Sequence, residues 1–354
     1  MPGDANAAAL SWAGFVGYAL GAAVLGGIAV TGSRRARRVA AARGRLSELL
    51  CTAAAGGNAR IVITGATSGI GAELALELGR HSSVSLLLGC RDIQRGEAVA
   101  ARCAPGQATV AQLDCLDLSS VRRFAAVAHE FLEADTTGAS DLRLVVNNAG
   151  VMSCPQQSSA DGFEPTWATN FLAPFLTTEL LAASRNAQSS PPLRVVNVAS
   201  RLEKRSKLTA DALDLVANPV AALQKPTNGM RASAYSDSKR ALMLWIAARC
   251  KALANSHATH VHASTPGMVD TQLGRYSMPA ALWPLTKPVR WLLLRSPAEG
   301  ALAAVAAGLV DGADRAVGQY MDAEVVLETL PETRADQAGL AAALVAWANQ
   351  ACKL

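Results

Sequence analysis

The chain has 354 residues, of which 51% are hydrophobic, and it carries a formal net charge of +5 at pH 7. This length and apolar content are enough to bury a full core, in one large domain or in two smaller ones. The charge excess is small, and part of it is gathered in one cluster, Arg34, Arg35, Arg37 and Arg38. We therefore expect no nucleic-acid partner.

Cysteine and histidine usage gives no sign of a metal. The seven cysteines are odd in number and include no C-x-x-C pair, which is typical of reduced thiols in a reducing compartment. His260 and His262 alternate along a strand-like run without a cysteine or carboxylate cluster beside them. Because a metal requires a complete ligand set, the sequence predicts no metal site.

Residues 1–33 are predicted to be a membrane anchor. No charged residue lies between Ala5 and Ser33, and a dense apolar run begins at Leu10 and ends at Val30. About 20 apolar residues cross a bilayer as a helix, so this run is long enough to span it. The alternative is a cleaved signal peptide, but such a peptide carries positive charge before a shorter apolar stretch, whereas here the arginine cluster follows.

The arginine cluster also predicts the orientation of the chain. Positive residues stay on the cytosolic side, so we expect a single-pass protein whose catalytic domain is cytosolic, at the endoplasmic reticulum if the source is eukaryotic. Residues 34–57 are rich in Ala, Arg, Leu and Glu and are predicted to form a basic helical stalk that ends at Gly56 and Gly57. Residues 58–354 are then a single catalytic domain.

Short β-rich runs alternate with longer helical stretches after residue 58. The runs are 60–64, 84–88, 109–113, 142–146, 193–198 and 259–263. Helix-like stretches of ten or more residues between them require parallel strands with crossover helices on both faces. The predicted fold is therefore a doubly wound parallel α/β sheet of the Rossmann type.

A glycine-rich turn follows the first run. Gly65, Gly69 and Gly71 lie where the strand passes into a helical pattern. Glycines at such a junction allow a tight turn and close approach to a pyrophosphate, whose charge faces the helix N-terminus. An ordinary glycine-rich turn is the alternative, but the position after the first strand favours a dinucleotide site.

The end of the second run predicts which dinucleotide binds. It reads Cys90-Arg91-Asp92, with cysteine where an NAD-binding carboxylate is expected. Arg91 can neutralise a 2′-phosphate, which favours NADP, whereas Asp92 argues the other way. Asp117 and Leu118, after the third run, are expected to lie against the adenine, and a helix cap at Asp117 is the alternative.

Tyr235 and Lys239 are four residues apart in a helical pattern and so share a helix face. A cation there would lower the pKa of the tyrosine toward the range of an acid/base catalyst, although an exposed pair has the same spacing. Ser200 and residues 147–150 follow two further strands at the edge where open α/β sheets bind ligands. Asn170, inside an apolar helix, requires a polar partner.

In their order along the chain, these motifs resemble those of the short-chain dehydrogenase/reductase family, over about residues 58–325. The resemblance implies that Tyr235 is the general acid/base and that Ser200 polarises the substrate oxygen. It implies that Lys239 binds the nicotinamide ribose and that Asn170 holds a water relaying protons to it. The cofactor residues that it implies, with those argued above, are Gly65, Thr67, Ser68, Gly69, Ile70, Gly71, Arg91, Asp117, Leu118, Asn147, Ala149, Gly150, Tyr235, Lys239, Pro266, Gly267, Val269 and Thr271.

Three features resemble the retinol dehydrogenase-like branch: Cys90-Arg91-Asp92, the long segment between Ser200 and Tyr235, and the tail Gly318-Gln319-Tyr320-Met321-Asp322. That branch implies a membrane-bound, NADP(H)-dependent enzyme. Features shared with protochlorophyllide reductases leave a carbon-carbon double-bond reductase open. A membrane-tethered NADP-binding sensor without turnover is the alternative from another class, although it would normally lack the tyrosine or the lysine.

The substrate is expected to be lipophilic. Residues 274–296, where the family's variable lid falls, carry Trp283, Trp291 and Leu292 to Leu294 among basic residues. This pattern suits a lid that touches lipid headgroups, and a buried helical pair is the alternative. The expected substrate is a small lipophilic carbonyl or alcohol of the retinoid, steroid or long-chain aldehyde type. A homodimer is compatible with these assignments.

Overall fold

The computed structural model describes residues 32–54, 57–134, 142–154, 158–184, 191–209, 228–252, 258–276, 284–310, 319–321, 327–329 and 335–354. The apolar run expected to be the membrane anchor lies outside these ranges. Within them, no helix combines the length and the apolar character that crossing a membrane requires.

The centre of the molecule is an eight-stranded sheet in the order β3-β2-β1-β4-β5-β6-β7-β8, in which neighbouring strands from β3 to β7 are parallel and β8 is antiparallel to β7. The predicted doubly wound sheet is thus confirmed, with two short strands added at one edge. The strands are β1 (Ala59–Thr64), β2 (Val84–Cys90), β3 (Ala108–Gln112), β4 (Leu142–Asn147), β5 (Leu193–Val198), β6 (Thr259–Ser264), β7 (Gln319–Met321) and β8 (Leu327–Thr329).

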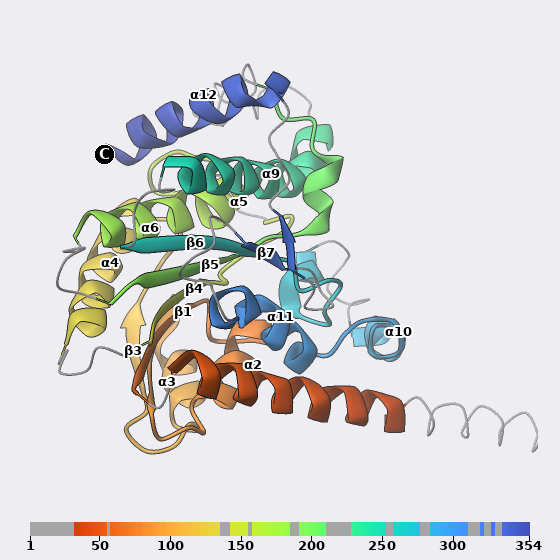
Figure 1. Cartoon of the computed structure of the whole chain (residues 1–354). Helices are drawn as coiled ribbons and strands as arrows, with labels where there is room; N and C mark the ends of the chain where they lie inside the picture. The colour runs from red at the N-terminus through yellow and green to blue at the C-terminus, as the bar shows by residue number, and fades with distance from the viewer. Residues whose placement is uncertain are drawn as a thin grey trace, which may run out of the picture.

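Helices cover both faces of the sheet (Figure 1). They are α2 (Gly69–Leu78), α3 (Ile93–Ala100), α4 (Leu118–Glu133), α5 (Pro165–Trp167), α6 (Ala173–Ala183), α9 (Asn228–Ala252), α10 (Lys287–Leu293), α11 (Pro297–Leu309) and α12 (Ala335–Cys352). A π-helical segment, Ala168–Leu172, joins α5 to α6, and 3₁₀ turns occupy Arg201–Arg205, Gln272–Tyr276 and Pro284–Thr286.

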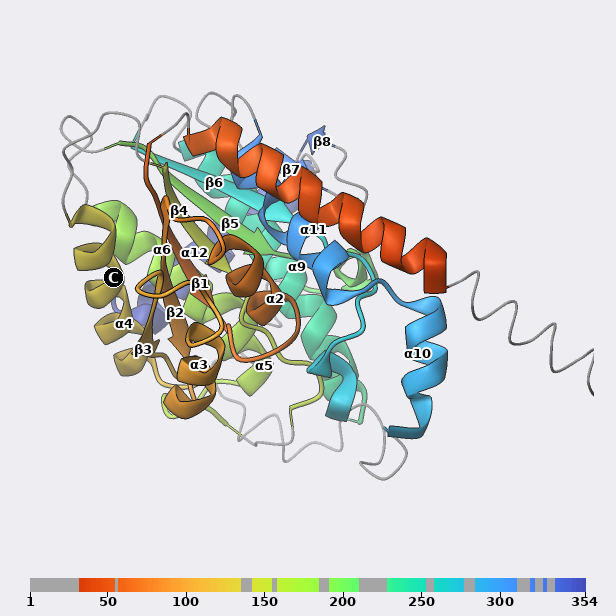
Figure 2. The same ribbon diagram turned by 90° about the horizontal axis from the view of Figure 1, so that it is seen from below.

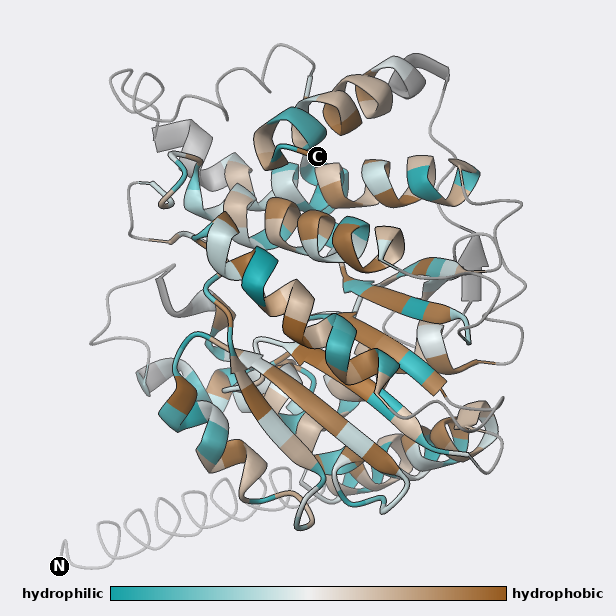
Figure 3. Cartoon of the chain, turned by 90° about the vertical axis from the view of Figure 1, so that its left-hand side faces the viewer, coloured by the Kyte–Doolittle hydropathy of each residue, from teal (hydrophilic) through white to brown (hydrophobic). Residues whose placement is uncertain are grey.

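Successive strand residues point to opposite faces and so divide the core in two. Val62 of β1 belongs to the cluster under α4, α6, α9 and α12, whereas Ile61 and Ile63 belong to the cluster under α2, α3 and α11. The central strands are apolar along most of their length because both faces are covered (Figure 3).

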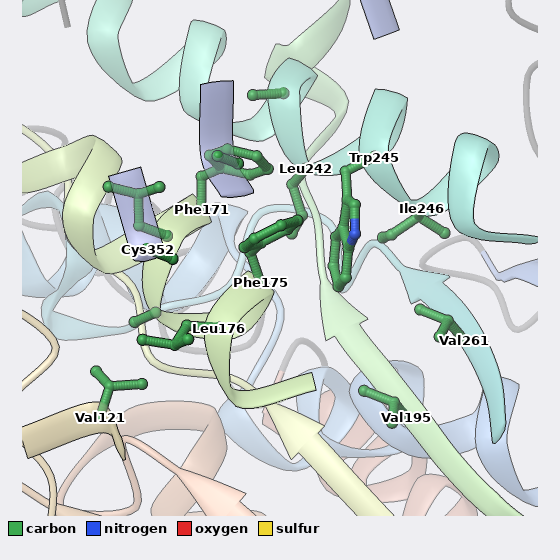
Figure 4. Close-up of a cluster of buried hydrophobic side chains, with 14 of the residues drawn as sticks. Val121, Phe171, Phe175, Leu176, Val195, Leu242, Trp245, Ile246, Val261 and Cys352 are labelled. Carbon is green, nitrogen blue, oxygen red and sulfur yellow. The ribbon is translucent and has the colours of Figure 1, made fainter. Parts of the chain in front are cut away.

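Aromatic side chains fill the first of these clusters. The ring of Phe175 lies edge-on to Trp245 of α9, with centroids 5.4 Å apart, and next to Phe171 (Figure 4). Trp347 of α12 stacks on Phe171 and meets Trp167 edge-on. The C-terminal helix α12 therefore covers this part of the core, and its Trp347 packs against Phe171 of the π-helical segment.

Residues 34–54, from the predicted basic stalk, lie in a helix over residues 32–54, and this helix packs along the domain. Leu46, Leu49 and Leu50 are buried in the same cluster as α2 and α11. Arg43 forms ion pairs of 2.7 Å with both Glu73 and Glu77 of α2. The segment is therefore docked against the sheet domain over much of its length, with its first turns extending past α11 (Figure 2).

Candidate active site

The glycine turn after β1 has the backbone that its sequence predicts. Gly65 and Gly69 have φ of 70° and 59°, in the left-handed region that side chains rarely adopt. A Cβ on Gly65 would lie 2.8 Å from the Cα of Ala149, and one on Gly71 would lie 2.5 Å from the Nδ2 of Asn148. Two of the three glycines are thus required by the close approach of the loop after β4.

Two residues missed as site residues hold that approach together. Thr64 Oγ1 accepts hydrogen bonds from the backbone N–H groups of Asn148 and Ala149, each 3.0 Å long. The Nδ2 of Asn148 donates to the carbonyls of Thr64, at 2.9 Å, and Gly65, at 3.3 Å. The only sequence signal for them is their place at the ends of neighbouring parallel strands, which meet at one edge of the sheet.

Asn147 serves the sheet itself. Its buried Nδ2 donates to Asn197 Oδ1 of β5 at 3.0 Å and to Thr178 Oγ1 of α6 at 3.2 Å. The support that it gives to a cofactor is therefore indirect: it fixes the ends of two strands from which Gly150 and Ser200 follow.

We expect Gly65→Ala to weaken NADPH binding and to lower the free energy of unfolding by about 1–3 kcal/mol, because alanine at this φ is strained and its Cβ overlaps backbone. Thermal unfolding with and without NADPH measures both effects. Gly106→Ala is the matched control, since Gly106 has φ of 77° with open space around its Cβ position. Equal effects on NADPH binding in the two variants would contradict the steric argument.

The end of β2 carries the residues that bear on cofactor choice. Asp92 caps α3, where its side chain accepts from the backbone N–H of Arg95 at 3.0 Å. Cys90 is buried, and burial raises the pKa of its thiol to about 11. Arg91 is exposed, and its carbonyl accepts a hydrogen bond from Gln112 Nε2. Asp92 thus has a capping role, while the Arg91 side chain faces solvent at the ligand-binding edge.

Asp117 takes the second of its two predicted roles. Its carboxylate caps α4 by accepting a hydrogen bond from the backbone N–H of Ser119 at 2.8 Å. The pKa of Asp117 is lowered, mainly by a hydrogen bond with the side chain of Ser119. Leu118 is buried, and its backbone N–H donates to Asp161 Oδ2. These contacts fix the start of α4 at the edge where the adenine is expected.

The structure brings Tyr235, Ser200 and Lys239 together at the carboxyl end of β5. Tyr235 is 7% exposed, and its hydroxyl is hydrogen-bonded to the side chain of Ser200. Ser200 Oγ also accepts from the backbone N–H of Leu202 at 3.3 Å, which fixes one lone pair of the serine. One turn along α9, the buried ammonium of Lys239 donates to the carbonyl of Val198 at 2.6 Å.

The ionisation of this pair differs from the expectation that the lysine lowers the pKa of the tyrosine. Burial raises the pKa of Tyr235 above its usual value and outweighs the lowering by the bond to Ser200. Burial also lowers the pKa of Lys239 to about 8. The physical reason is that both groups are desolvated, and the ammonium is engaged by the Val198 carbonyl. The tyrosine is therefore poised as a proton donor.

Asn170 has the polar partners that its position demanded. It lies in the π-helical segment, a helix defect often found at functional sites. Its Oδ1 accepts from Val151 N at 2.9 Å, and its Nδ2 donates to the Val151 carbonyl and, at 3.2 Å, to Ser238 Oγ. Ser238 Oγ in turn donates to the carbonyl of Tyr235 at 2.9 Å. Ser238, which the sequence did not single out, thus links the loop after β4 to the catalytic turn of α9.

Ion pairing and hydrogen bonding also tie the turn after Ser200 to α9. The buried carboxylate of Glu203 pairs with Arg240 at 2.9 Å, and Ser206 Oγ donates to Asp237 Oδ1 at 2.6 Å. Both partners belong to the helix that carries Tyr235. These two contacts therefore hold the turn after Ser200 against the helix that carries Tyr235.

The loop after β6 closes over the glycine turn. Gly267 has φ of 78°, and Val269 forms a bridge with Arg295. The side chain of Thr271 lies 3.1 Å from a Cβ position on Gly69, and Val269 lies beside Ile70 around the small Gly300 of α11. The predicted cofactor residues from Pro266 to Thr271 are thus next to those from Gly65 to Gly71.

Comparisons with known proteins agree with this geometry. A family model described as short chain dehydrogenase matches residues 59–209. Dehydrogenase/reductase SDR family member 13 of Bos taurus is 32% identical over 327 residues, which cover 91% of this chain and 78% of that protein. Retinol dehydrogenase 12 of Homo sapiens is 34% identical over 265 residues, covering 73% of this chain and 76% of that protein.

A solved structure extends the likeness to the fold. An uncharacterized protein from Mycobacterium paratuberculosis superposes with a TM-score of 0.58 and 29% identity, covering 85% of this chain and 97% of that one. The identity to the bovine relative extends over most of both chains, and the matching family model begins at β1 and includes Ser200. The chain therefore belongs to the short-chain dehydrogenase/reductase family of oxidoreductases.

Proposed function

We propose that this protein is a membrane-anchored NADP(H)-dependent oxidoreductase that interconverts a carbonyl and an alcohol on a lipophilic substrate. The observation that carries the proposal is the buried Tyr235 hydroxyl, bonded to Ser200 and one helical turn from the buried Lys239. This arrangement stands beside a glycine turn suited to a dinucleotide. It offers a proton and a hydrogen-bond donor to one oxygen atom, as carbonyl reduction requires.

In the reduction direction each residue has a separate task. The bound cofactor supplies the hydride. Tyr235 donates its phenolic proton to the oxygen that becomes the alcohol, and its raised pKa keeps that proton in place at neutral pH. Ser200 donates a hydrogen bond to the same oxygen, while Lys239 binds the nicotinamide ribose. In the oxidation direction the tyrosine takes the proton back.

Arg91 supports NADP(H) as the cofactor, because its exposed guanidinium stands at the end of β2 while Asp92 is engaged as a helix cap. We expect Arg91→Ala to raise the KM for NADPH about 10- to 100-fold, the loss of one charge-assisted phosphate contact, and to leave the KM for NADH unchanged. Steady-state kinetics with both cofactors measure this. Arg95→Ala, an exposed arginine on the neighbouring α3, is the control, and a similar loss there would contradict a specific contact.

A lipophilic substrate is supported by the relative named retinol dehydrogenase 12 and by the apolar run of residues 10–30. The test is NADPH oxidation by the full chain in lipid vesicles, with retinal, steroid ketones, long-chain aldehydes, enones and small polar ketones. Fastest turnover of a lipid carbonyl supports the proposal. Faster turnover of small polar ketones would overturn the lipophilic class, reduction of the enone double bond would identify a double-bond reductase, and NADPH binding without turnover would indicate a sensor.

The membrane assignment follows from the sequence. The run from Leu10 to Val30 anchors the chain, and the following arginines place the catalytic domain in the cytosol, at the endoplasmic reticulum in a eukaryote. Carbonate extraction of membranes separates an anchored chain, which stays in the pellet, from one that is peripherally bound.

A further inference from the structure

Helix α10 presents an apolar face to solvent. Val289, Leu292 and Leu293 are 57%, 55% and 73% exposed, and their spacing places them on one side of the helix. Met268, from the adjoining loop, is 75% exposed. These are four of the six large hydrophobic side chains that are exposed in the described part of the chain. In the described part of the segment over residues 274–296, α10 is therefore not a buried helix.

The start of the helix over residues 32–54 holds α10 in place. Arg35 donates hydrogen bonds to the carbonyls of Trp291 and, at 3.1 Å, Leu294, and its guanidinium lies 5.4 Å above the Trp291 ring. One turn further, Arg38 pairs with Glu299 of α11 at 2.9 Å. Both views show α10 beside the first turns of this helix and away from the sheet (Figures 1 and 2).

The contact between α10 and the start of the helix over residues 32–54 indicates what covers the apolar face of α10. Only Thr31 separates Gly32, where the described helix begins, from Val30, the end of the apolar run. A Cβ added to Gly32 would lie 3.9 Å from the ring of Trp291 in α10, so Gly32 and α10 are neighbours. A chain that leaves a bilayer just before Gly32 therefore brings α10 to the bilayer surface. Arg34 and Arg37, in the first turns of the helix over residues 32–54, and Lys287, the first residue of α10, are exposed and suit anionic headgroups.

We propose that α10 is a second membrane contact, which inserts Val289, Leu292 and Leu293 into the surface of an anionic bilayer and is held there by Arg35. The inference rests on the anchor proposed above and adds a second site to it. A second protein copy is a poorer occupant, since three side chains are far smaller than a stable dimer interface of roughly 1,200–2,000 Å².

Helix α10 is bonded to the loop after β6, which carries predicted cofactor residues. Arg290 of α10 pairs with Asp270 at 3.5 Å, and the backbone N–H of Arg295 donates to the carbonyl of Met268 at 2.9 Å. Asp270 and Met268 belong to the loop that lies against the glycine turn. Bilayer contact at α10 therefore brings that loop close to the lipid surface.

The test uses the full chain in vesicles of phosphatidylcholine and phosphatidylserine. An environment-sensitive fluorophore is attached to Leu293→Cys in a Cys51→Ser background, and Val127→Cys is the matched control, an exposed apolar position on α4 across the sheet. The parent chain labelled in parallel corrects for the half-buried native thiols. Quenching by nitroxides near the headgroup end of the lipid chains is expected to be at least about threefold stronger at 293 than at 127.

Each outcome bears on the proposal. A chain that floats with the vesicles but is quenched equally at both positions overturns the α10 contact and leaves the anchor intact. A chain that does not float overturns both. The Arg35→Ala variant should float with the vesicles as the parent does, while quenching at position 293 falls. Unchanged quenching would refute the role of Arg35 in holding α10 at the bilayer. Carbonyl reduction in the same vesicles reports separately on the proposed activity.

Discussion

Tyr235→Phe is expected to lower kcat for carbonyl reduction by about 10²- to 10⁴-fold, the usual contribution of a positioned proton donor. Phenylalanine keeps the buried ring, so the packing around a side chain that is only 7% exposed is preserved. The variant loses the phenolic proton and the hydrogen bond with Ser200. NADPH binding should remain close to that of the parent, and stopped-flow measurement of NADPH oxidation on a lipid carbonyl separates the two effects.

Tyr320→Phe is the matched control for this experiment. Tyr320 is also buried, and its hydroxyl donates to Thr265 Oγ1 at 3.0 Å. Its loss should cost about 1 kcal/mol of unfolding free energy, as for an ordinary hydrogen bond, with little change in kcat. If Tyr235→Phe retained parental turnover, the proton would come from another group and the proposed mechanism would be wrong.

The strands from β1 to β6 could be predicted to within two residues, and all of them except the partly exposed edge strand β3 are apolar runs buried on both faces. β7 and β8 could not, since each has three residues and contributes too little periodicity. The helix over residues 32–54 was predicted as a helix, but its docking was not. Its arginines pair with Glu73, Glu77 and Glu299, which come from two separate later helices.

In the candidate site, too, features with a local sequence pattern could be predicted and features that depend on distant contacts could not. Tyr235, Lys239 and the glycines are recognisable because their spacing is local and their strand ends share one edge. The roles of Asn148 and Ser238 depend on contacts with Thr64 and Asn170, 84 and 68 residues away, which no local pattern records. The raised pKa of Tyr235 also depends on burial by distant segments, and for this reason local reasoning about the neighbouring lysine gave the wrong direction.

Lys239 should give the reaction its alkaline limit. Burial lowers the pKa of Lys239 to about 8, below its ordinary 10.5, so the ammonium is present below pH 8 and is lost as the pH rises through that value. The cation binds the ribose in the proposed mechanism. We therefore expect kcat/KM for NADPH, which reports the cofactor-free protein, to be level at neutral pH and to fall above about pH 8.

Two substitutions at this position test the assignment. Lys239→Met removes the charge while keeping an unbranched apolar stem, and it should lower kcat/KM for NADPH by about 10²-fold or more and abolish the fall near pH 8, because no group there titrates. Lys239→Arg keeps a cation at every accessible pH, so any activity that it retains should extend to higher pH. An alkaline limit that stayed near pH 8 in both variants would belong to another group. In that case the buried lysine would be a structural donor to the Val198 carbonyl.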